Sequence, residues 1–262
     1  MASLSEFRAY AITNMMELEV ILSEVYAARV SGETGFTMFD GGAHKGFHTK
    51  KMLDLPGCER VFAVEADPFT AETLQKNLAD RIDRPLPQLH IIQKALQDNP
   101  SVTTIAWKSS PSHVGRSSIV SDNAKRSTIW RDNADIQYRD EMRIEATTID
   151  LILAGETAPV PFLKLDLEGA DLLALRGASR TLAVKRPIVA YENSIHAPEV
   201  HGFTVAEMAG FFAKLDYVPM NFVGEPMGPD NWFGFFEAWS APKEMVDWLA
   251  QTIRVAIAKR PI

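Results

Sequence analysis

The sequence predicts an α/β fold built on a doubly wound sheet of parallel strands. Two observations indicate this fold. From residue 36 onward, short apolar runs that end in an acidic residue alternate with segments of helical periodicity. The first run passes through a glycine-rich turn, FTMFDGGAHKG over residues 36–46, into a helix-like segment. Strands in this order are joined by right-handed crossovers, and ligands bind at their carboxyl ends.

Length and composition indicate one large domain with added elements. The chain has 262 residues, of which 46% are apolar, enough to bury a core without disulfide bonds. Cys58 is the one cysteine, which excludes an internal disulfide and is compatible with a reducing cytoplasm. The net charge of −7 argues against a nucleic-acid-binding surface. Because the sequence shows no signal-peptide pattern and no bilayer-length apolar run, we expect a cytoplasmic protein that does not bind membranes.

The N-terminal segment has apolar residues at helical spacing from residue 3 to about residue 30, which predicts one long amphipathic helix. Its polar face is acidic rather than basic, so we expect the apolar stripe to pack on the main domain and not on a membrane. Formation of a homodimer and a role as a lid over the ligand are alternatives. The predicted organisation is a helical extension at residues 1–32 followed by one domain at residues 33–262.

The first part of that domain predicts three strands separated by two helices. The strands are expected at residues 36–40, 61–65 and 89–95, and the helices at 46–55 and 69–81. Residues 97–147 then form a polar segment that we interpret as an insertion, partly β, that covers the site and contributes to substrate choice. Strand-like pieces lie at residues 102–107 and 142–146. His113 and Arg116 are candidate substrate contacts within the insertion.

Regular alternation returns after residue 147. A short helical turn is expected at residues 148–153, and later helices at 171–182, 203–215 and 242–259. Strands are expected at residues 161–166, 187–192, 217–222 and 232–239. The strands at 161–166 and 187–192 both end in an acid, so their carboxylates are expected at the ligand-binding edge of the sheet.

The glycine-rich turn favours a cationic ligand over a phosphate. Glycines allow positive φ angles and let a ligand approach the main chain closely. A dinucleotide site has the spacing G-x-G-x-x-G, whereas Gly41, Gly42 and Gly46 are spaced differently and Asp40 would repel a phosphate. A nicotinamide dehydrogenase is therefore disfavoured. S-adenosylmethionine (SAM) has cationic groups that suit Asp40 and a ribose diol that suits Glu65, although an ordinary turn with solvated acids is the alternative.

Several segments, taken together and in order, resemble the FkbM family of SAM-dependent methyltransferases. They are DGGAHKGFHT, VFAVEADP, KALQDN, GRSSI, TTIDLIL and KLDLEGADLLALRGASRTLAVKRPIVAYEN. The resemblance runs from about Phe36 to Asn193, and KLDLEGADLLALRGA is its most specific part. It implies the Rossmann-like class I methyltransferase fold, with a seven-stranded, mostly parallel sheet whose last strand is antiparallel. The implied reaction is O-methylation of a hydroxyl on a small metabolite or glycan.

The resemblance also implies which residues bind SAM. Asp40, Gly42 and Gly46 are expected at the methionine end, Glu65 at the ribose, and Ala95 with its neighbours at the adenine. The full set of expected cofactor contacts is Asp40, Gly41, Gly42, Ala43, His44, Gly46, Glu65, Ala66, Lys94, Ala95 and Asp166. Two positions depart from the family pattern. His44 stands where Asn is common, although it can offer one ring donor, and Ala66 stands where Pro usually follows the acid.

Methyl transfer from a sulfonium is an in-line displacement, so the protein has to align the nucleophile and remove its proton. Acids and histidines at the strand ends are the candidates for this base. Asp166 or Glu168 can act as the base directly, with Lys164 supporting the local field. His196, which follows the next strand, is a further candidate.

A second mechanism requires a metal ion. Asp166, Glu192 and Asn193 form an oxygen-rich set of the kind that Mg²⁺ prefers, and the ion would lower the pKa of the substrate hydroxyl. This set is similar to the arrangement of catechol-type O-methyltransferases. A different class of function is also open, in which the chain is a catalytically silent SAM-binding or interaction module. The silent form is expected to have Asp166 and Glu192 engaged in internal pairs.

Overall fold

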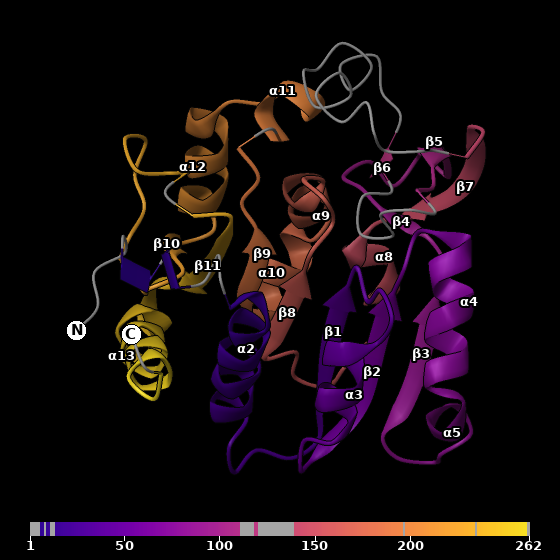
Figure 1. The fold of residues 1–262 in the computed structure, drawn as a ribbon, viewed down its shortest axis with the longest axis horizontal. Helices are drawn as coiled ribbons and strands as arrows, with labels where there is room; N and C mark the ends of the chain where they lie inside the picture. Colours follow the sequence, from indigo (N-terminus) through magenta and orange to yellow (C-terminus); the bar gives the residue numbers. More distant parts are fainter. Residues whose placement is uncertain are drawn as a thin grey trace.

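The computed structural model describes residues 6–7, 9–10, 14–110, 118–119, 139–195, 197–233 and 235–260. A seven-stranded sheet forms its centre (Figure 1). In spatial order the strands are β10 (Tyr217–Asn221), β11 (Glu237–Pro242), β9 (Ile188–Glu192), β8 (Phe162–Leu165), β1 (Phe36–Gly41), β2 (Cys58–Val64) and β3 (Gln88–Ile92). β11 is antiparallel to both of its neighbours, and the other pairs are parallel. This confirms the predicted mostly parallel sheet with an antiparallel last strand.

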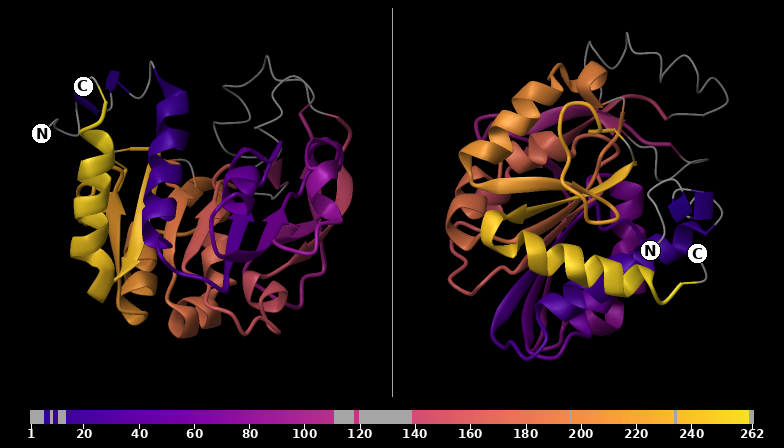
Figure 2. Two further views of the ribbon diagram at one scale, coloured as in Figure 1. Left: turned by 90° about the horizontal axis from the view of Figure 1, so that it is seen from below. Right: turned by 90° about the vertical axis from the view of Figure 1, so that its left-hand side faces the viewer.

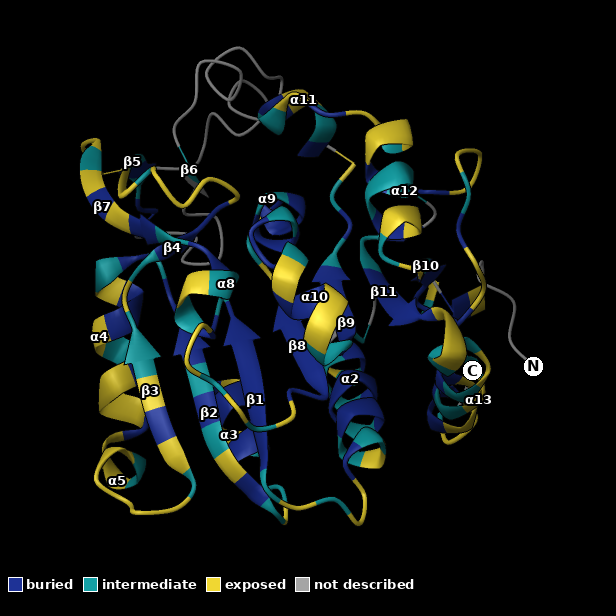
Figure 3. Ribbon diagram, turned by 180° about the vertical axis from the view of Figure 1, so that it is seen from behind, coloured by how far each residue is buried: buried dark blue, intermediate teal, exposed yellow. Residues whose placement is uncertain are grey.

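The central strands β1 and β8 are buried along their whole length, because both faces of the sheet are covered (Figure 3). Successive residues point to opposite faces, so Met38 packs in one apolar cluster and Phe39 in the other. The first cluster includes side chains of α2 (Met15–Arg29), α3 (Phe47–Leu53) and α13 (Val246–Ile257). The second includes side chains of α9 (Asp171–Arg176), α10 (Ser179–Lys185) and α12 (Val205–Lys214).

The N-terminal helix differs from its prediction. Asn14 has φ −129° and ψ 55°, outside the helical region, so the expected single helix over residues 3–30 is interrupted and α2 begins at Met15. The apolar side of α2 is buried as predicted, with Ile21 and Val25 fully enclosed. α2 lies beside α13 (Figure 2), where Arg260 bonds both Glu17 and Glu24. The helix is therefore built into the main core.

The insertion contains the expected β structure. β5 (Thr104–Lys108) and β7 (Met142–Thr147) pair antiparallel, close to the predicted pieces at 102–107 and 142–146. With β4 (Ala95–Leu96) and β6 (Ser118–Ile119) they form a small sheet in the order β4-β7-β5-β6. It lies above β2 and β3 at the carboxyl-end edge of the main sheet (Figure 1). His113 and Arg116 lie outside the described residues.

Three further elements depart from the sequence prediction. The helix expected at 171–182 divides into α9 and α10 at Gly177, where a Cβ would lie 2.1 Å from the carbonyl oxygen of Gln97. The last strand begins at Glu237 rather than residue 232, because the carbonyls of Trp232 and Phe235 are turned toward the side chain of Asn193. A short helix, α11 (Ala197–His201), was not predicted.

The helix expected at 69–81 is also divided, into α4 (Pro68–Asn77) and α5 (Ala79–Ile82). The helix α8 (Ile149–Ile152) and the 3₁₀ helix η2 (Lys243–Met245), which leads into α13, lie near their predicted positions. Cys58 is buried at the start of β2, and burial raises the pKa of its thiol to about 12, consistent with a structural role. Among the helices of the described residues, none is both long enough and apolar enough to cross a bilayer.

Replacement of Ile21 by Ala should lower the free energy of unfolding by about 3 kcal/mol, because a fully buried side chain leaves a cavity between α2 and the sheet. Met16→Ala is the control on the same helix, since Met16 is 62% exposed and its loss should change stability by less than about 0.5 kcal/mol. Urea unfolding measures both. Equal stabilities of the two variants would show that α2 is not part of the cooperative core.

Candidate functional site

A cavity opens at the carboxyl ends of β1, β2 and β8. This is the edge where ligands bind in open α/β sheets. The cavity is lined by Gly42, His44, Glu65, Ala66, Ala95, Leu96, Trp107, Ile119, Asp166, Leu167, Glu168 and Ala170. The cavity lies at the edge of the sheet that the sequence predicts for the site, and seven of the predicted site residues line it: Gly42, His44, Glu65, Ala66, Ala95, Asp166 and Glu168.

The glycines of the turn are required by packing within the protein as well as by access to the cavity. Gly42 has φ 71°, and a Cβ on it would lie 1.9 Å from the carbonyl oxygen of Asp166. Gly46 has φ 90° just before α3, and a Cβ there would lie 2.9 Å from Leu74 of α4. Larger residues would push the turn away from β8. Gly41, Ala43 and Gly46 support the turn but are not among the cavity-lining residues.

Glu65 projects from the end of β2 with both carboxylate oxygens held by the backbone. The amide of His44 donates to Oε2 and the amide of Asp67 donates to Oε1, each at 2.9 Å. Each oxygen keeps a second lone pair, so the carboxylate can accept further hydrogen bonds from a ligand in the cavity. Burial raises the pKa of Glu65 to about 7, although the two backbone donors favour the charged form.

His44, which stands where the resemblance expects Asn, has a backbone conformation that Asn would also favour. Its φ is 50°, in the left-handed region that Asn and His occupy more readily than most residues. Its backbone amide, rather than its ring, makes the hydrogen bond to Glu65. Burial and the neighbouring Lys45 lower the pKa of His44, which favours the neutral imidazole at the cavity wall.

Trp107 forms a wall of the cavity that the sequence analysis did not identify. Its indole Nε1 donates to Oδ2 of Asp67 at 3.2 Å, and Ser109 Oγ donates to the same oxygen. The other oxygen, Oδ1, accepts from the amides of Phe69 and Thr70 and so caps α4. One carboxylate thus fixes the insertion to the helix that follows Glu65. The sequence feature that could have indicated Trp107 is its position as an aromatic residue at the end of a predicted strand within the insertion.

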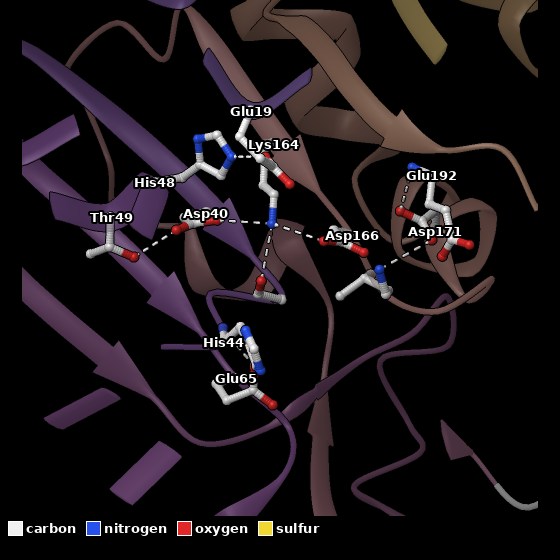
Figure 4. Close-up of polar contacts among 12 residues, drawn as sticks. Glu19, Asp40, His44, His48, Thr49, Glu65, Lys164, Asp166, Asp171 and Glu192 are labelled. Carbon is white, nitrogen blue, oxygen red and sulfur yellow. Dashed lines mark hydrogen bonds and ion pairs between the residues drawn. The ribbon is translucent and has the colours of Figure 1, made fainter. Parts of the chain in front are cut away.

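Lys164 lies beneath the cavity floor, where it joins two of the predicted acids (Figure 4). Its ammonium is 3.5 Å from Oδ1 of Asp40 and 3.6 Å from Oδ2 of Asp166, and it donates to the carbonyl of Gly42 at 3.0 Å. Asp40 is completely buried and also accepts from Thr49 at 2.6 Å. Asp40 was predicted to contact the cofactor directly, but the structure encloses it against Lys164, below the cavity lining.

The loop after β8 presents Asp166 and Glu168 to the cavity. The Asp166 side chain is 44% exposed, which leaves it open to the cavity despite its ion pair with Lys164. Glu168 has φ 53°, in the left-handed region that is uncommon for residues other than glycine. The buried carboxylate of Asp171 accepts from the amides of Leu167 and Glu192, so it fixes this loop to β9.

The residues predicted to bind Mg²⁺ do not form a ligand set. Glu192 accepts from the amide of Gly169 at 2.9 Å, and Asn193 donates to the carbonyls of Trp232 and Phe235 behind the loop. In the ranges that the structure describes, no three His, Cys, Asp or Glu side chains are grouped to hold a metal ion. These residues do not fit the metal-dependent mechanism.

The pKa values of Glu192 and Asp171 are raised by the same two causes. Both are buried and both face other carboxylates, so burial and like charge disfavour ionisation. The pKa of Glu237 is also raised, first by burial and then by the carboxylates of Asp166 and Glu19. The region between α2, β9 and β11 is therefore rich in acids, with Lys164 as the cation among them.

Two other predicted residues lie apart from the cavity or beyond the description. Lys94 pairs with Glu145 of β7 at 2.9 Å and does not line the cavity. His196 lies outside the described residues, so its role as a base stays a prediction. His48 lies apart from His44 and from the cavity, since it bonds Glu19 and lies near Tyr26 on the α2 side of the sheet.

Comparison with known proteins matches residues 40–219 to the family model of the methyltransferase FkbM domain. A search of curated proteins found no match. Among solved structures, methyltransferase FkbM from Methylobacillus flagellatus is 18% identical over 90% of this chain, with a TM-score of 0.48, and this chain spans 60% of its length. The O-methyltransferase TomG from Streptomyces achromogenes, in complex with SAM, is 11% identical, with a TM-score of 0.44 and coverage of 84% of this chain and 79% of that chain. An O-methyltransferase from Bacillus cereus, in complex with S-adenosylhomocysteine (SAH), is 12% identical, with a TM-score of 0.44 and coverage of 90% of this chain and 97% of that chain.

The raised pKa of Glu65 predicts a pH-dependent stability of the ligand-free protein. Because the folded state prefers the protonated acid, the stabilisation is complete below pH 4.5 and is lost as the pH rises through about 7. From pH 5 to pH 8 the wild-type protein should lose about 2 kcal/mol more unfolding free energy than Glu65→Gln, which cannot ionise. Urea unfolding of both proteins at the two pH values measures this difference. Parallel pH profiles would contradict the prediction.

Proposed function

The chain belongs to the FkbM methyltransferase family, and from that premise we propose that it transfers a methyl group from SAM to a hydroxyl of a small metabolite or sugar. One observation carries the proposal. Glu65 and Asp166, from the ends of β2 and β8, line the same cavity with Gly42 between the two strands. This arrangement supports roles for Glu65 as a ribose-binding carboxylate and for Asp166 as a base within one site.

The cavity fits SAM by the chemistry of its lining. Glu65 keeps free lone pairs for the two hydroxyls of a ribose, and its carboxylate is fixed in orientation by two amides. Ala66, Ala95, Trp107 and Ile119 provide an apolar wall suited to adenine. Asp166 and Glu168 provide negative charge for a cationic ligand. When bound, SAM supplies an electrophilic methyl group on a positively charged sulfur.

Asp166 is the residue that we assign as the base. It is exposed to the cavity, and its carboxylate lies 3.6 Å from the buried ammonium of Lys164. A charged carboxylate can accept the proton of a substrate hydroxyl as the oxygen attacks. Glu168 lines the same cavity two residues later and is the alternative base.

The insertion is the part of the site that we expect to select the substrate. Trp107 of β5 and Ile119 of β6 both reach the cavity, so residues of the insertion border the bound molecules. The acidic lining and net charge of −7 suit a small hydroxylated compound better than a nucleic acid. A cytoplasmic location and a homodimer formed by the terminal helices stay predictions.

A catalytically silent SAM-binding module is the second candidate function. It is favoured by Glu192, which is engaged internally with Gly169. Asp166 is also paired internally, with Lys164, as expected of the silent form. Its side chain nevertheless stays 44% exposed at the cavity, and this exposure is the observation that favours the enzyme. The enzyme is therefore the better supported reading of the geometry.

Calorimetry with S-adenosylhomocysteine tests the cofactor site. The wild-type protein should bind it, and Glu65→Ala should weaken binding by at least about tenfold, because the ribose hydroxyls lose a carboxyl partner. Glu59→Ala is the control, since Glu59 is exposed on the same strand away from the cavity and its loss should leave the affinity unchanged. Absence of binding by the wild-type protein would refute the proposed function.

A screen of hydroxylated metabolites and sugars with isotope-labelled SAM tests the reaction. With the acceptor that gains a methyl group, Asp166→Asn should lower kcat by at least about 100-fold through loss of the base. Asp247→Asn on α13 is the matched control and should leave kcat unchanged, because Asp247 is exposed far from the cavity. If Glu168→Gln abolishes transfer while Asp166→Asn retains it, the base is Glu168.

A further inference from the structure

Lys164 occupies a position that direct cofactor or substrate binding does not explain. The residue is only 5% exposed and is not among the cavity-lining residues. Its ammonium nevertheless contacts three groups that come from two strand ends, as Figure 4 shows. Two belong to the β1 side, the carboxylate of Asp40 and the carbonyl of Gly42, and one to the β8 side, the carboxylate of Asp166.

The charge on this ammonium is maintained although the side chain is buried. Burial alone would lower the pKa of Lys164, but Asp40 and Asp166 more than offset it, and the pKa is raised above its ordinary value. Glu19 of α2 and Glu237 of β11 act in the same direction from farther away. Both of these acids lie outside residues 40–219, the region matched by the family model.

The two strand ends joined by Lys164 are already in close contact through the backbone. The amide of Asp166 donates to the carbonyl of Gly41 at 3.1 Å, and the Gly42 turn leaves no room for a side chain beside the Asp166 carbonyl. These contacts fix the main chain but leave the Asp166 side chain, 44% exposed, free to rotate. An ammonium held by the buried Asp40 restricts that carboxylate to the side facing the turn.

We propose that Lys164 is a positioning residue for methyl transfer, which couples the cofactor-binding turn at Gly42 to the carboxylate of Asp166. Asp40 serves as the fixed anchor, since it is fully buried and bonded to Thr49. Movement of the turn on cofactor binding is thereby transmitted to the base through one cation. The inference deepens the proposed function and rests on it, because it takes Asp166 as the base.

The test requires a variant that loses the link but still folds. Lys164→Met alone leaves Asp40 buried without a counter-charge and should be strongly destabilised. The double variant Asp40→Asn with Lys164→Met removes both charges and should recover most of the thermal stability, since no unpaired charge stays buried. Lys185→Met is the matched control, because the Lys185 ammonium is also held by carbonyl oxygens, those of Thr157 and Ala158, far from the cavity.

S-adenosylhomocysteine calorimetry and amide hydrogen exchange are the first readouts, because neither needs an acceptor. In the double variant the Kd for S-adenosylhomocysteine should rise at least about tenfold. Relative to the wild-type protein, exchange at the amides of Gly42 and Asp166 should accelerate more than exchange at the amides of β10 and β11. In assays with the acceptor returned by the screen, kcat should fall at least about 100-fold, a larger change than the rise in the KM for SAM. Lys185→Met should match the wild-type protein in each measurement.

The outcomes separate this inference from the proposed function. A double variant that folds and keeps wild-type Kd and wild-type exchange at Gly42 and Asp166 would overturn the positioning role and leave the proposed function intact. If the wild-type protein itself does not bind S-adenosylhomocysteine, the proposed function fails. The positioning role in methyl transfer then fails with it, and hydrogen exchange tests only the link between the turn and Lys164, which unchanged exchange at Gly42 in the double variant would contradict.

Discussion

The buried ammonium of Lys164 lies between carboxylates that come from the ends of two neighbouring strands. Taking this charge out of water is unfavourable unless several oxygens surround it, and Asp40, Asp166 and the Gly42 carbonyl provide them. The arrangement requires β1 and β8 to be adjacent and parallel, so that both strands end at the same level. The electrostatics of the site and the topology of the sheet therefore depend on each other.

A second carboxylate organises the other side of the cavity. Asp67 caps α4 with one oxygen and holds Trp107 and Ser109 with the other. Since Asp67 also donates its amide to Glu65, this cavity-lining acid and the insertion are fixed by the same residue. Variation within the insertion can thus change one wall of the cavity while Glu65 keeps its orientation.

The sequence was informative where local patterns and burial agree. Buried strands with terminal acids and glycines at a turn appear as short-range signals, so β1, β2, β8 and the cavity edge were predicted correctly. The helix over residues 171–182 was predicted as continuous because periodicity does not register the close approach of Gln97 to Gly177. The last strand was placed five residues too early, because the aromatic run from Trp232 has high strand propensity but packs in a turn around Asn193.

By itself, the sequence determined the fold class, the edge of the sheet that carries the site, and the acids and glycines that reach that edge. Only the tertiary structure decided what each acid does. Asp40 and Glu65 are equivalent in the sequence, each an acid at the end of an apolar run, yet one is enclosed against Lys164 and the other faces the cavity. The difference arises from contacts with residues more than 100 positions away, such as Lys164 beside Asp40, and such contacts leave no short-range pattern in the chain.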